Sequence, residues 1–450
     1  MDFVKEGESD IKALFNRIKK GDFSGSTGIA IKNSIYQFST TLIGKIGSLV
    51  LTIILARLLM PELFGLYSLA LSTILIFVAF SDLGIGETLI RFVSRELGKK
   101  NLPKAKAYWE YLIRIKFLVM LVVSLILVFA AGPISEIYNK PISLALIAGI
   151  LYIFFGGIVV SLQALLQAHN IFKPILFREI VFQITRVIII PLVVLYSIKN
   201  IETGPLVSII IGILSLSFAI SAILLYYSSK KTALIKETKT KTLSLKNKLE
   251  IKRFVLLNST IIFSGIFFGY IDIVMLGYFL SSEYIGYFQG AFSFINSAIS
   301  LITFSAALLP IFSRLKKGKM DLFFKKTIRV VSIVSVASFL FILLASKPLI
   351  LAIFGSEYEP SVNILRILSL LLLSIPVTTI YSTYFISSGK PGIVSKSLII
   401  STIMNITLNY IFISYMLAYG PMYAVYGSAI ATIISRYFYL FLLIVWKKRV

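Results

Sequence analysis

The stretch ILARLLMPELFGLYSLALS, residues 54–72, aligns without gaps on MLGYFLSSEYIGYFQGAFS, residues 275–293. Identical residues stand at corresponding positions, since Leu55, Leu59, Glu62, Gly65, Ala70 and Ser72 recur as Leu276, Leu280, Glu283, Gly286, Ala291 and Ser293. Further along each copy, Lys173-Pro174 recurs as Lys390-Pro391. The sequence therefore predicts two related halves.

The composition around this repeat is that of a membrane protein. Hydrophobic residues fill 57% of the 450 positions and charged residues only 14%, which leaves too little polar surface for a soluble chain. Apolar runs of about 20 residues mark helices that can cross a bilayer. We expect twelve, near residues 33–58, 64–86, 111–132, 142–168, 175–197, 205–229, 254–280, 284–311, 328–353, 361–388, 391–415 and 422–446. The predicted class is an all-α integral membrane protein.

The distribution of Lys and Arg predicts how the chain is oriented. Most of the 45 basic residues fall in the N-terminal arm, in the connections after the even-numbered spans and in the C-terminal tail. The odd-numbered connections contain only Lys140, Lys199 and Lys347. By the positive-inside rule, both termini are expected in the cytoplasm. The expected location is the plasma membrane. Attraction to anionic lipid headgroups explains the net charge of +25 without a nucleic-acid partner.

The expected organisation has four parts. Residues 1–29 form a cytoplasmic arm, 30–229 and 254–450 are two six-helix lobes, and 230–253 is a basic linker between them. In the arm, DIKALFNRIKK has helical spacing of apolar residues and is typical either of a helix on the inner leaflet or of a disordered tail. An even number of spans per lobe gives both lobes one orientation, with a pseudo-two-fold axis along the membrane normal. Substrate sites in such proteins lie between the lobes.

Polar side chains form stripes along several predicted spans. The stripes are Glu179, Gln183 and Arg186; Gln37, Thr41, Lys45, Ser48 and Thr52; Gln289, Ser293, Asn296, Ser300 and Thr303; and Ser397, Ser401, Asn405 and Asn409. Steps of three and four residues place each set on one helix face. A charge that faces lipid near the bilayer centre costs roughly 3 kcal/mol, so such residues are expected to face a cavity or a partner.

These stripes, together with the charged residues Arg178, Asp272 and Arg436 at other positions in the spans, supply the candidate site residues. The expected substrate-binding residues are Lys45, Arg178, Arg186, Arg436, Gln37, Gln183 and Asn405, and the ion-coupling candidates are Asp272 and Glu179. The alternative is structural: Ser and Asn often join membrane helices, Glu179 and Arg186 can satisfy each other, and Asp272 can form a local ion pair. The glycines of GIFFG, Gly265 and Gly269, are expected to permit close helix packing.

Several kinds of chemistry have no support in the sequence. The chain has no Cys and only one His, so it holds no thiolate or two-histidine metal motif. It also has no G-x-x-x-x-G-K-[ST] phosphate-binding loop, which argues against ATP hydrolysis. We expect no catalytic residue, no metal and no cofactor, other than a coupling H⁺ or Na⁺.

The segments ARLLMPELFGLYSLA (56–70), SDLGIG (81–86) and DIVMLGYFLSSEYIGYFQGA (272–291) resemble the polysaccharide transporters of the multidrug/oligosaccharidyl-lipid/polysaccharide exporter superfamily, which includes the Wzx-type oligosaccharide flippases. The resemblance extends over nearly the whole chain through the order of spans and the repeat. It implies two six-helix bundles that form a V around a central cavity. It also implies flipping of lipid-diphosphate-linked sugars from the cytoplasmic to the outer leaflet.

The expected function is therefore a flippase for lipid-diphosphate-linked oligosaccharides that works by alternating access through a cationic cavity. The expected partners are a polyprenyl-diphosphate-linked oligosaccharide, membrane lipids and polysaccharide assembly enzymes, with the chain acting as a monomer. The nearest competing function is an ion-coupled multidrug exporter of the same superfamily. A membrane glycosyltransferase or ligase that acts on the lipid carrier is a candidate of a different class, and so is a purely structural membrane subunit.

Overall fold

The computed structural model describes residues 25–230, 232–236, 240–303, 312 and 317–449. The predicted surface helix or disordered tail in the N-terminal arm lies outside the described residues, as does the end of the eighth predicted span. Every regular element in the described part of the chain is a helix.

The first half contains α2 (Gly25–Asp82), α3 (Ile85–Gly98), α4 (Leu102–Tyr138), α5 (Ser143–Ala168), α6 (Lys173–Ser197), α7 (Thr203–Ser229) and the short α8 (Ala233–Lys236). The second half contains α9 (Leu245–Phe279), α10 (Ser282–Ile302), α12 (Lys317–Ile353), the 3₁₀ turn η1 (Ser356–Tyr358), α13 (Ser361–Leu368), α14 (Leu371–Ser387), α15 (Pro391–Leu417) and α16 (Pro421–Arg449). The repeated Lys-Pro dipeptide opens both α6 and α15, the fifth span of each half.

The described residues contain 11 helical stretches that are long and apolar enough to cross a membrane. The first stretch holds two of the predicted spans, because α2 is broken at Met60, where φ is 57° and ψ is 172°. Pro61 follows, and proline cannot donate the hydrogen bond that a continuous helix needs at this position. The all-α membrane fold is confirmed, and the predicted twelve spans correspond to eleven stretches with one break.

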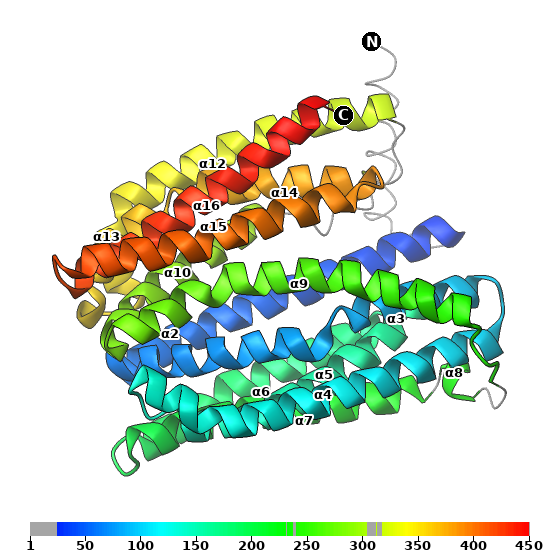
Figure 1. Ribbon diagram of the computed structural model, residues 1–450, viewed down its shortest axis with the longest axis horizontal. Coiled ribbons are helices and arrows are strands. Elements are labelled where there is room, and N and C mark those ends of the chain that lie inside the picture. The colour runs from blue at the N-terminus through cyan, green and yellow to red at the C-terminus, as the bar shows by residue number, and fades with distance from the viewer. Residues whose placement is uncertain (1–24, 231, 237–239, 304–311, 313–316, 450) are drawn as a thin grey trace.

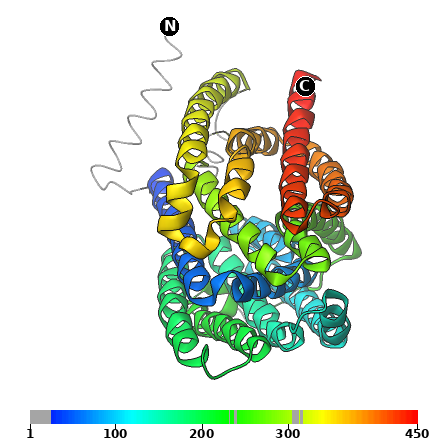
Figure 2. The ribbon, with the colours of Figure 1, turned by 90° about the vertical axis from the view of Figure 1, so that its left-hand side faces the viewer.

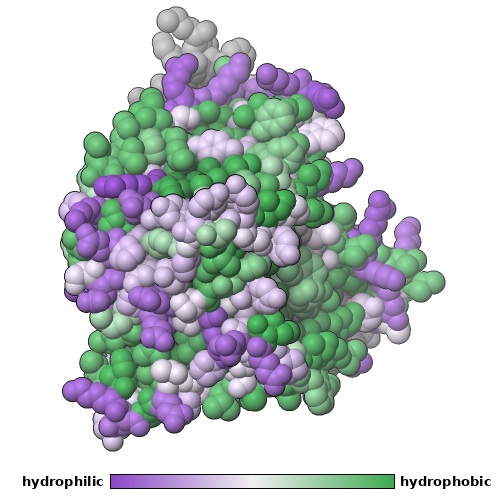
Figure 3. All heavy atoms as spheres, turned by 60° about the vertical axis from the view of Figure 1, so that its left-hand side comes forward, coloured by the Kyte–Doolittle hydropathy of each residue, from purple (hydrophilic) through white to green (hydrophobic). Residues whose placement is uncertain are grey.

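Figures 1 and 2 show the arrangement of the two halves. Helices α2 to α7 form one group, α12 to α16 form the other, and α9 and α10 lie between them. The end that carries α3, α8 and the C-terminal end of α16 is called the basic end. The opposite end, with the connections 139–142, 198–202, 280–281, 354–360 and 418–420, is called the short-loop end. Figure 3 shows hydrophilic and weakly polar side chains on the short-loop end, beside a largely hydrophobic flank.

The two copies of the repeat pack directly against each other. A Cβ atom on Gly65 would lie 1.8 Å from the carbonyl oxygen of Ser282, and a Cβ atom on Gly286 would lie 2.0 Å from that of Pro61. Ser282 and Pro61 occupy equivalent positions in the repeat, so this contact is reciprocal, as a two-fold axis requires. Lipid tails are as apolar as Leu, so membrane helices associate largely through such close van der Waals packing.

The close approach is therefore made by the repeat glycines and not by GIFFG. A Cβ atom on Gly265 or Gly269 would have no neighbouring atom of another helix within 4 Å among the described residues. The expectation of close helix packing there is therefore wrong. The spacing of small residues permits a close approach, but a neighbouring helix must also lie on that face. On α9 the close neighbour lies instead beside Gly277, whose Cβ atom would meet the side chain of Leu69 at 2.4 Å.

Polar contacts join the two halves at the short-loop end. The hydroxyl of Tyr358 donates to the carbonyl of Ala56 at 3.1 Å, and Nζ of Lys140 donates to the carbonyls of Gly277 and Leu280 at 2.7 and 2.8 Å. Ala56 and Gly277 are equivalent in the repeat, so each half reaches across to the same position in the other. The carbonyls of Gly277 and Leu280 lie where α9 ends and intrahelical donors run out, and the carbonyl of Ala56 lies in the turn before the break at Met60.

A third contact adds to this set. Arg57 donates to the carbonyls of Ala352 and Ile353 at the C-terminal end of α12, through Nη2 and through Nε at 2.8 Å. Cations at helix C-termini are favoured by the helix dipole. Arg57 and Lys140 of the first half therefore cap α12 and α9 of the second half.

Candidate functional site

A cavity of about 460 Å³ lies between α2, α5, α6, α7 and α10. Most of its polar lining comes from the stripes seen in the sequence. The polar lining includes Gln37, Lys45, Ser48, Glu179, Gln183, Arg186, Asn296 and Ser300 of the stripes and, outside them, Ser297. A second cavity of about 270 Å³, between α10, α12 and α14, has a mostly apolar lining and offers little to a charged ligand.

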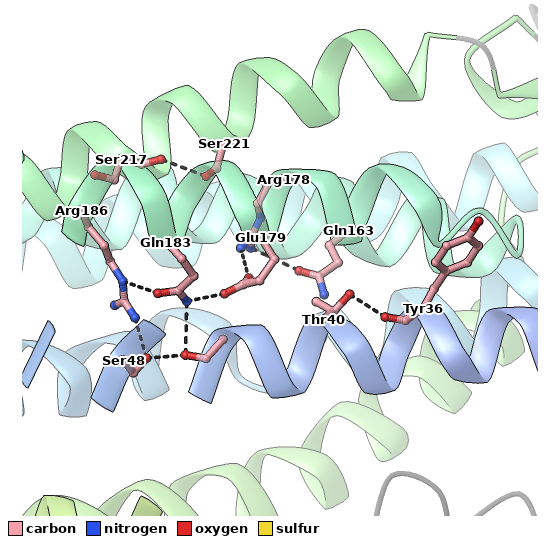
Figure 4. Close-up of polar contacts among 11 residues, drawn as sticks. Tyr36, Thr40, Ser48, Gln163, Arg178, Glu179, Gln183, Arg186, Ser217 and Ser221 are labelled. Carbon is pink, nitrogen blue, oxygen red and sulfur yellow. Dashed lines mark hydrogen bonds and ion pairs between the residues drawn. The ribbon is translucent and has the colours of Figure 1, made fainter. Parts of the chain in front are cut away.

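A chain of hydrogen bonds runs along α6 (Figure 4). Nη1 of Arg178 donates to Oε2 of Glu179 at 2.6 Å, and Nε2 of Gln183 donates to Oε1 of Glu179 at 2.5 Å. Oε1 of Gln183 then accepts from Nε of Arg186 at 2.8 Å. Spacing of three and four residues brings Glu179, Gln183 and Arg186 together on one face, as the sequence predicted. The chain fixes the orientation of the Arg186 guanidinium.

Two glycines of α2 make room for this chain. A Cβ atom on Gly47 would lie 2.2 Å from Oε1 of Gln183, and one on Gly44 would lie 3.0 Å from Oε1 of Glu179. Nε2 of Gln183 also donates to the carbonyl of Gly44 at 3.2 Å. The absence of side chains at Gly44 and Gly47 therefore lets the polar side chains of α6 lie against the backbone of α2.

Two cations remain available to a ligand in the cavity. Nη2 of Arg186 donates to Oγ of Ser48 at 2.5 Å, and its guanidinium lies over the ring of Phe182, 4.9 Å from the centroid. Nζ of Lys45 donates to Oγ of Ser300, on α10 of the other half, at 2.6 Å. Neither cation has an acidic partner within 4 Å among the described residues.

Arg178 differs from these two cations. It is 7% exposed, and its partners are Glu179, Gln163 at 3.4 Å and the ring of Phe182. The adjacent carboxylate compensates its charge. The net charge of the cavity lining therefore comes from Lys45 and Arg186, and Arg178 lies behind Glu179, where it acts as the partner of that carboxylate.

The remaining predicted residues gather in a second polar cluster, between α9, α15 and α16. Asp272 is 1% exposed and accepts from Nδ2 of Asn409 at 2.8 Å and from Oγ1 of Thr432 at 2.7 Å. Asn409 also accepts from Ser428 at 2.7 Å. Nδ2 of Asn405 donates to Thr432 at 3.4 Å, while its buried Oδ1 has no hydrogen-bond partner in the described part of the chain.

Arg436 lies near this second cluster and not at the cavity. Its Nη2 donates to the carbonyl of Phe268 at 2.9 Å, and its guanidinium lies 3.7 Å from the centroid of the Phe268 ring. The predicted site residues thus form two groups. Lys45, Gln37, Glu179, Gln183 and Arg186 line the cavity, with Arg178 behind them, whereas Asp272, Asn405 and Arg436 lie together in the other half.

Two polar residues with notable positions are absent from the sequence predictions. Gln163 on α5 lines the cavity beside Arg178, and the available signal was a pair of Gln residues four apart, Gln163 and Gln167, within an apolar span. Lys116 on α4 is 1% exposed and its Nζ lies 2.7 Å from Oδ1 of Asp82. Lys116 falls near the basic end of its span, where a cation is expected to reach the membrane surface, so no local pattern distinguishes it as buried.

The fold is that of known membrane transporters. An inward-facing multidrug resistance MATE family transporter of the MOP superfamily matches with a TM-score of 0.66 and 14% identity over 90% of this chain and 96% of that one. The lipid II flippase MurJ in an inward closed conformation matches with a TM-score of 0.67 and 18% identity over 91% and 87%. A MOP superfamily transporter from Pyrococcus furiosus, described as having a binding pocket of reverse polarity, matches with a TM-score of 0.58 and 13% identity over 95% and 96%.

The sequence itself assigns the family. None of the curated proteins matches the chain. The family model described as "Polysaccharide biosynthesis protein" matches residues 30–316, which include the first copy of the repeat, the cavity-lining parts of α2, α5, α6 and α7, and the second copy of the repeat. This multi-pass membrane protein therefore belongs to the polysaccharide biosynthesis protein family.

Proposed function

We propose that this protein is a flippase that moves lipid-diphosphate-linked oligosaccharides from the cytoplasmic to the outer leaflet by alternating access. The observation that carries the proposal is the cavity whose charge comes from Lys45 and Arg186, without a compensating carboxylate for either among the described residues. Membership of a polysaccharide biosynthesis family supports a saccharide substrate. The MOP fold supports transport as the activity.

The chemistry of the cavity suits a diphosphate. A diphosphate carries only hydrogen-bond acceptors on its charged oxygens, and Lys45 and Arg186 offer donors with matching charge. Arg186 is held in place by Gln183 and Ser48, so little of its side-chain freedom is lost when it binds a ligand. The lipid tail stays in the bilayer while the head group enters the cavity.

The charge balance favours this proposal over an exporter of cationic drugs. A cationic substrate requires acidic or aromatic groups that it can approach, and of the three aromatic rings in the lining, Tyr152, Phe182 and Phe218, that of Phe182 already lies beneath the guanidinium of Arg186. The one carboxylate that lines the cavity is Glu179, among the described residues, and Arg178 and Gln183 already occupy both of its oxygens. A cation in this cavity would meet Lys45 and Arg186 instead, and like charges repel.

The driving force is proposed to come from a coupled H⁺ or Na⁺ at Asp272, assisted by the membrane potential. Asp272 is a buried carboxylate surrounded by hydroxyl and amide groups, and the Oδ1 of Asn405, unpartnered among the described residues, lies in the same cluster. Oxygen ligands of this kind suit a hard cation. Glu179, the other coupling candidate, is engaged by two donors and is assigned a positioning role for Arg186. The potential contributes about 2.3 kcal/mol per charge per 100 mV.

The proposal includes an orientation and partners. The basic end faces the cytoplasm of the cell and the short-loop end faces the outer surface, in accordance with the positive-inside rule. The proposed partners are the polyprenyl-diphosphate-linked oligosaccharide, anionic membrane lipids at the basic end and the enzymes of polysaccharide assembly. The protein is proposed to act as a monomer, because the cavity is formed entirely within one chain.

The test is flipping of a fluorescent lipid-linked sugar in proteoliposomes. We expect the double variant Lys45→Gln and Arg186→Gln to lose flipping, because both available cations are removed. The matched control removes two exposed cations outside the cavity, Arg329→Gln and Lys396→Gln, and is expected to retain flipping. Unimpaired flipping by the cavity variant would overturn the proposal.

A further inference from the structure

The two walls of the cavity differ in chemistry. The wall formed by α2 and α6 carries the cations, whereas the wall formed by α10 carries Asn296, Ser297 and Ser300 and no charged residue among those described. The hydroxyl of Ser297 donates to the carbonyl of Ser293 at 2.8 Å, which leaves its oxygen free to accept a hydrogen bond. Asn296 is exposed to the cavity and forms no hydrogen bond with any described residue.

An unpaired amide in a membrane span needs an explanation. Polar residues of α10 that serve as contacts within the protein have visible partners: Nε2 of Gln289 donates to Oγ of Ser293 at 3.1 Å, and Ser300 accepts from Lys45. Asn296 has no such partner in the described part of the chain, so the usual role of Asn in joining membrane helices does not account for it. The side-chain amide of Asn296 has an oxygen that accepts hydrogen bonds and an amino group that donates them. A ligand that satisfies both must itself donate and accept hydrogen bonds.

A diphosphate alone does not meet this requirement. Charged phosphate oxygens accept hydrogen bonds but cannot donate one to the oxygens of Asn296 and Ser297. Sugar hydroxyls both donate and accept, and they match an amide flanked by hydroxyls. Resting on the proposed function above, we propose that Asn296, Ser297 and Ser300 form a hydroxyl-recognition subsite for the sugar that lies next to the diphosphate.

The size of the cavity limits what this subsite can recognise. A volume of about 460 Å³ falls within the range of pockets for small ligands, roughly 300–1,000 Å³. The cavity therefore accommodates the diphosphate and the adjoining part of a head group, and a longer glycan extends beyond it. The α10 wall distinguishes substrates by the hydroxyl pattern close to the lipid, and the α2 and α6 wall binds all of them through the diphosphate.

The position of Ser300 gives the subsite a further property. Ser300 belongs to one half of the protein, and the Lys45 that it binds belongs to the other. When a phosphate oxygen accepts the hydrogen bond from Nζ of Lys45, the hydroxyl of Ser300 loses this partner and can bind a sugar hydroxyl instead. One ligand then replaces a direct contact between the halves with a contact to each of them.

The test measures the affinity of the purified full chain for two kinds of probe. One is polyprenyl diphosphate without sugar, and the others are polyprenyl diphosphates that carry a hexose, an N-acetylhexosamine or a 6-deoxyhexose. We expect the wild type to rank the glycosylated probes, with at least a fivefold spread. Asn296→Leu should reduce this spread to less than twofold, while affinity for the sugarless probe changes by less than twofold.

Controls separate the possible outcomes. Asn200→Leu removes an exposed amide outside the cavity and should leave every affinity unchanged. Lys45→Gln should weaken binding of all probes, with or without sugar. An unchanged ranking in both Asn296→Leu and the smaller Asn296→Ala overturns the subsite but leaves the diphosphate function standing. Wild-type protein that binds none of the probes overturns the proposed function itself.

Discussion

Gly65 and Gly286 occupy equivalent positions in the two halves, and each lies against the backbone that precedes the other. The carbonyl oxygen of Ser282 lies 1.8 Å from the position that a Cβ atom of Gly65 would take, and the carbonyl oxygen of Pro61 lies 2.0 Å from that of Gly286. No side chain larger than hydrogen fits at either of these two positions without separating the helices. The contact lies at the short-loop end, beside the bonds made by Lys140 and Tyr358.

Replacement of Gly65 by Ala should therefore force the two halves apart at the short-loop end. Overpacking of this kind costs about 1–3 kcal/mol, and here the opposing atom is backbone and cannot rotate away. The chain has no native Cys, so pairs of introduced Cys on α2 and α10 can carry spin labels without background. We expect a longer label distance in Gly65→Ala. Gly212→Ala, a site with open space, is the control.

Lys140→Gln should weaken the same end of the molecule without adding bulk. The change removes a cation whose Nζ binds two carbonyls at the end of α9, a loss of about 1–3 kcal/mol. We expect faster labelling of a Cys placed beside Gly277. Lys199→Gln changes an exposed cation in a neighbouring connection and should have no effect. Equal labelling rates in both variants would contradict the role of Lys140 in holding the end of α9 against the first half.

Gln183→Leu should reduce substrate binding although it retains every charge. Leu cannot accept from Arg186 or donate to Glu179 and to the Gly44 carbonyl, so the guanidinium loses its fixed orientation. At about 0.5–1.5 kcal/mol per hydrogen bond, affinity for polyprenyl diphosphate should fall about threefold to tenfold. Gln167→Leu, on α5 outside the cavity lining, should bind normally. Equal affinities would mean that Arg186 needs no positioning.

Asp272→Asn should uncouple transport from the ion gradient. Asn has nearly the same shape and can still form hydrogen bonds with Thr432 and Asn409. Its amide is uncharged, so it neither takes up a proton nor attracts Na⁺ as a carboxylate does. We expect flipping by this variant to be insensitive to collapse of the ion gradients at constant membrane potential. Glu202→Gln, an exposed acid, should behave as wild type. A variant that still responds to the gradients would exclude Asp272 as the coupling site.

Lys116→Met should destabilise the fold far more than Lys45→Met does. Lys116 is 1% exposed and Asp82 is 21% exposed, so removal of the cation leaves a partly solvated carboxylate, at a cost of about 1–3 kcal/mol. Lys45 is exposed in the cavity and loses only its bond to Ser300. Thermal unfolding in detergent should show a clear decrease for Lys116→Met alone. Addition of Asp82→Asn should restore part of the loss, since no unpaired carboxylate then remains.

The sequence predicts the parts of this fold that depend on local pattern. Long apolar runs mark the helices, the repeat marks the two halves, and steps of three and four residues bring Glu179, Gln183 and Arg186 together. Pro61 signals the break in α2 less clearly, because the preceding apolar run continues up to it.

The sequence cannot predict which helices meet face to face. Arg436 and Lys45 have the same character in the sequence, yet they lie in different polar clusters, because α16 packs against α15 and α9 while α2 packs against α6. From the sequence, Lys140 in its short connection is indistinguishable from a residue at the membrane surface. Only the structure shows that the end of α9 lies beside it. The prediction for GIFFG failed for the same reason, since the neighbour needed to complete the contact lies elsewhere.

The break at Met60 turns the first part of α2 into a lever. Lys45 lies fifteen residues before the break on a continuous helix, a distance of ~22 Å at 1.5 Å per residue. A tilt of about 5° about Met60 moves the backbone at Lys45 by ~2 Å over that length, enough to bring its amine to Ser300 or withdraw it. A small rotation at this break, next to the crossing of Gly65 and Gly286, would thereby be magnified at the cationic wall.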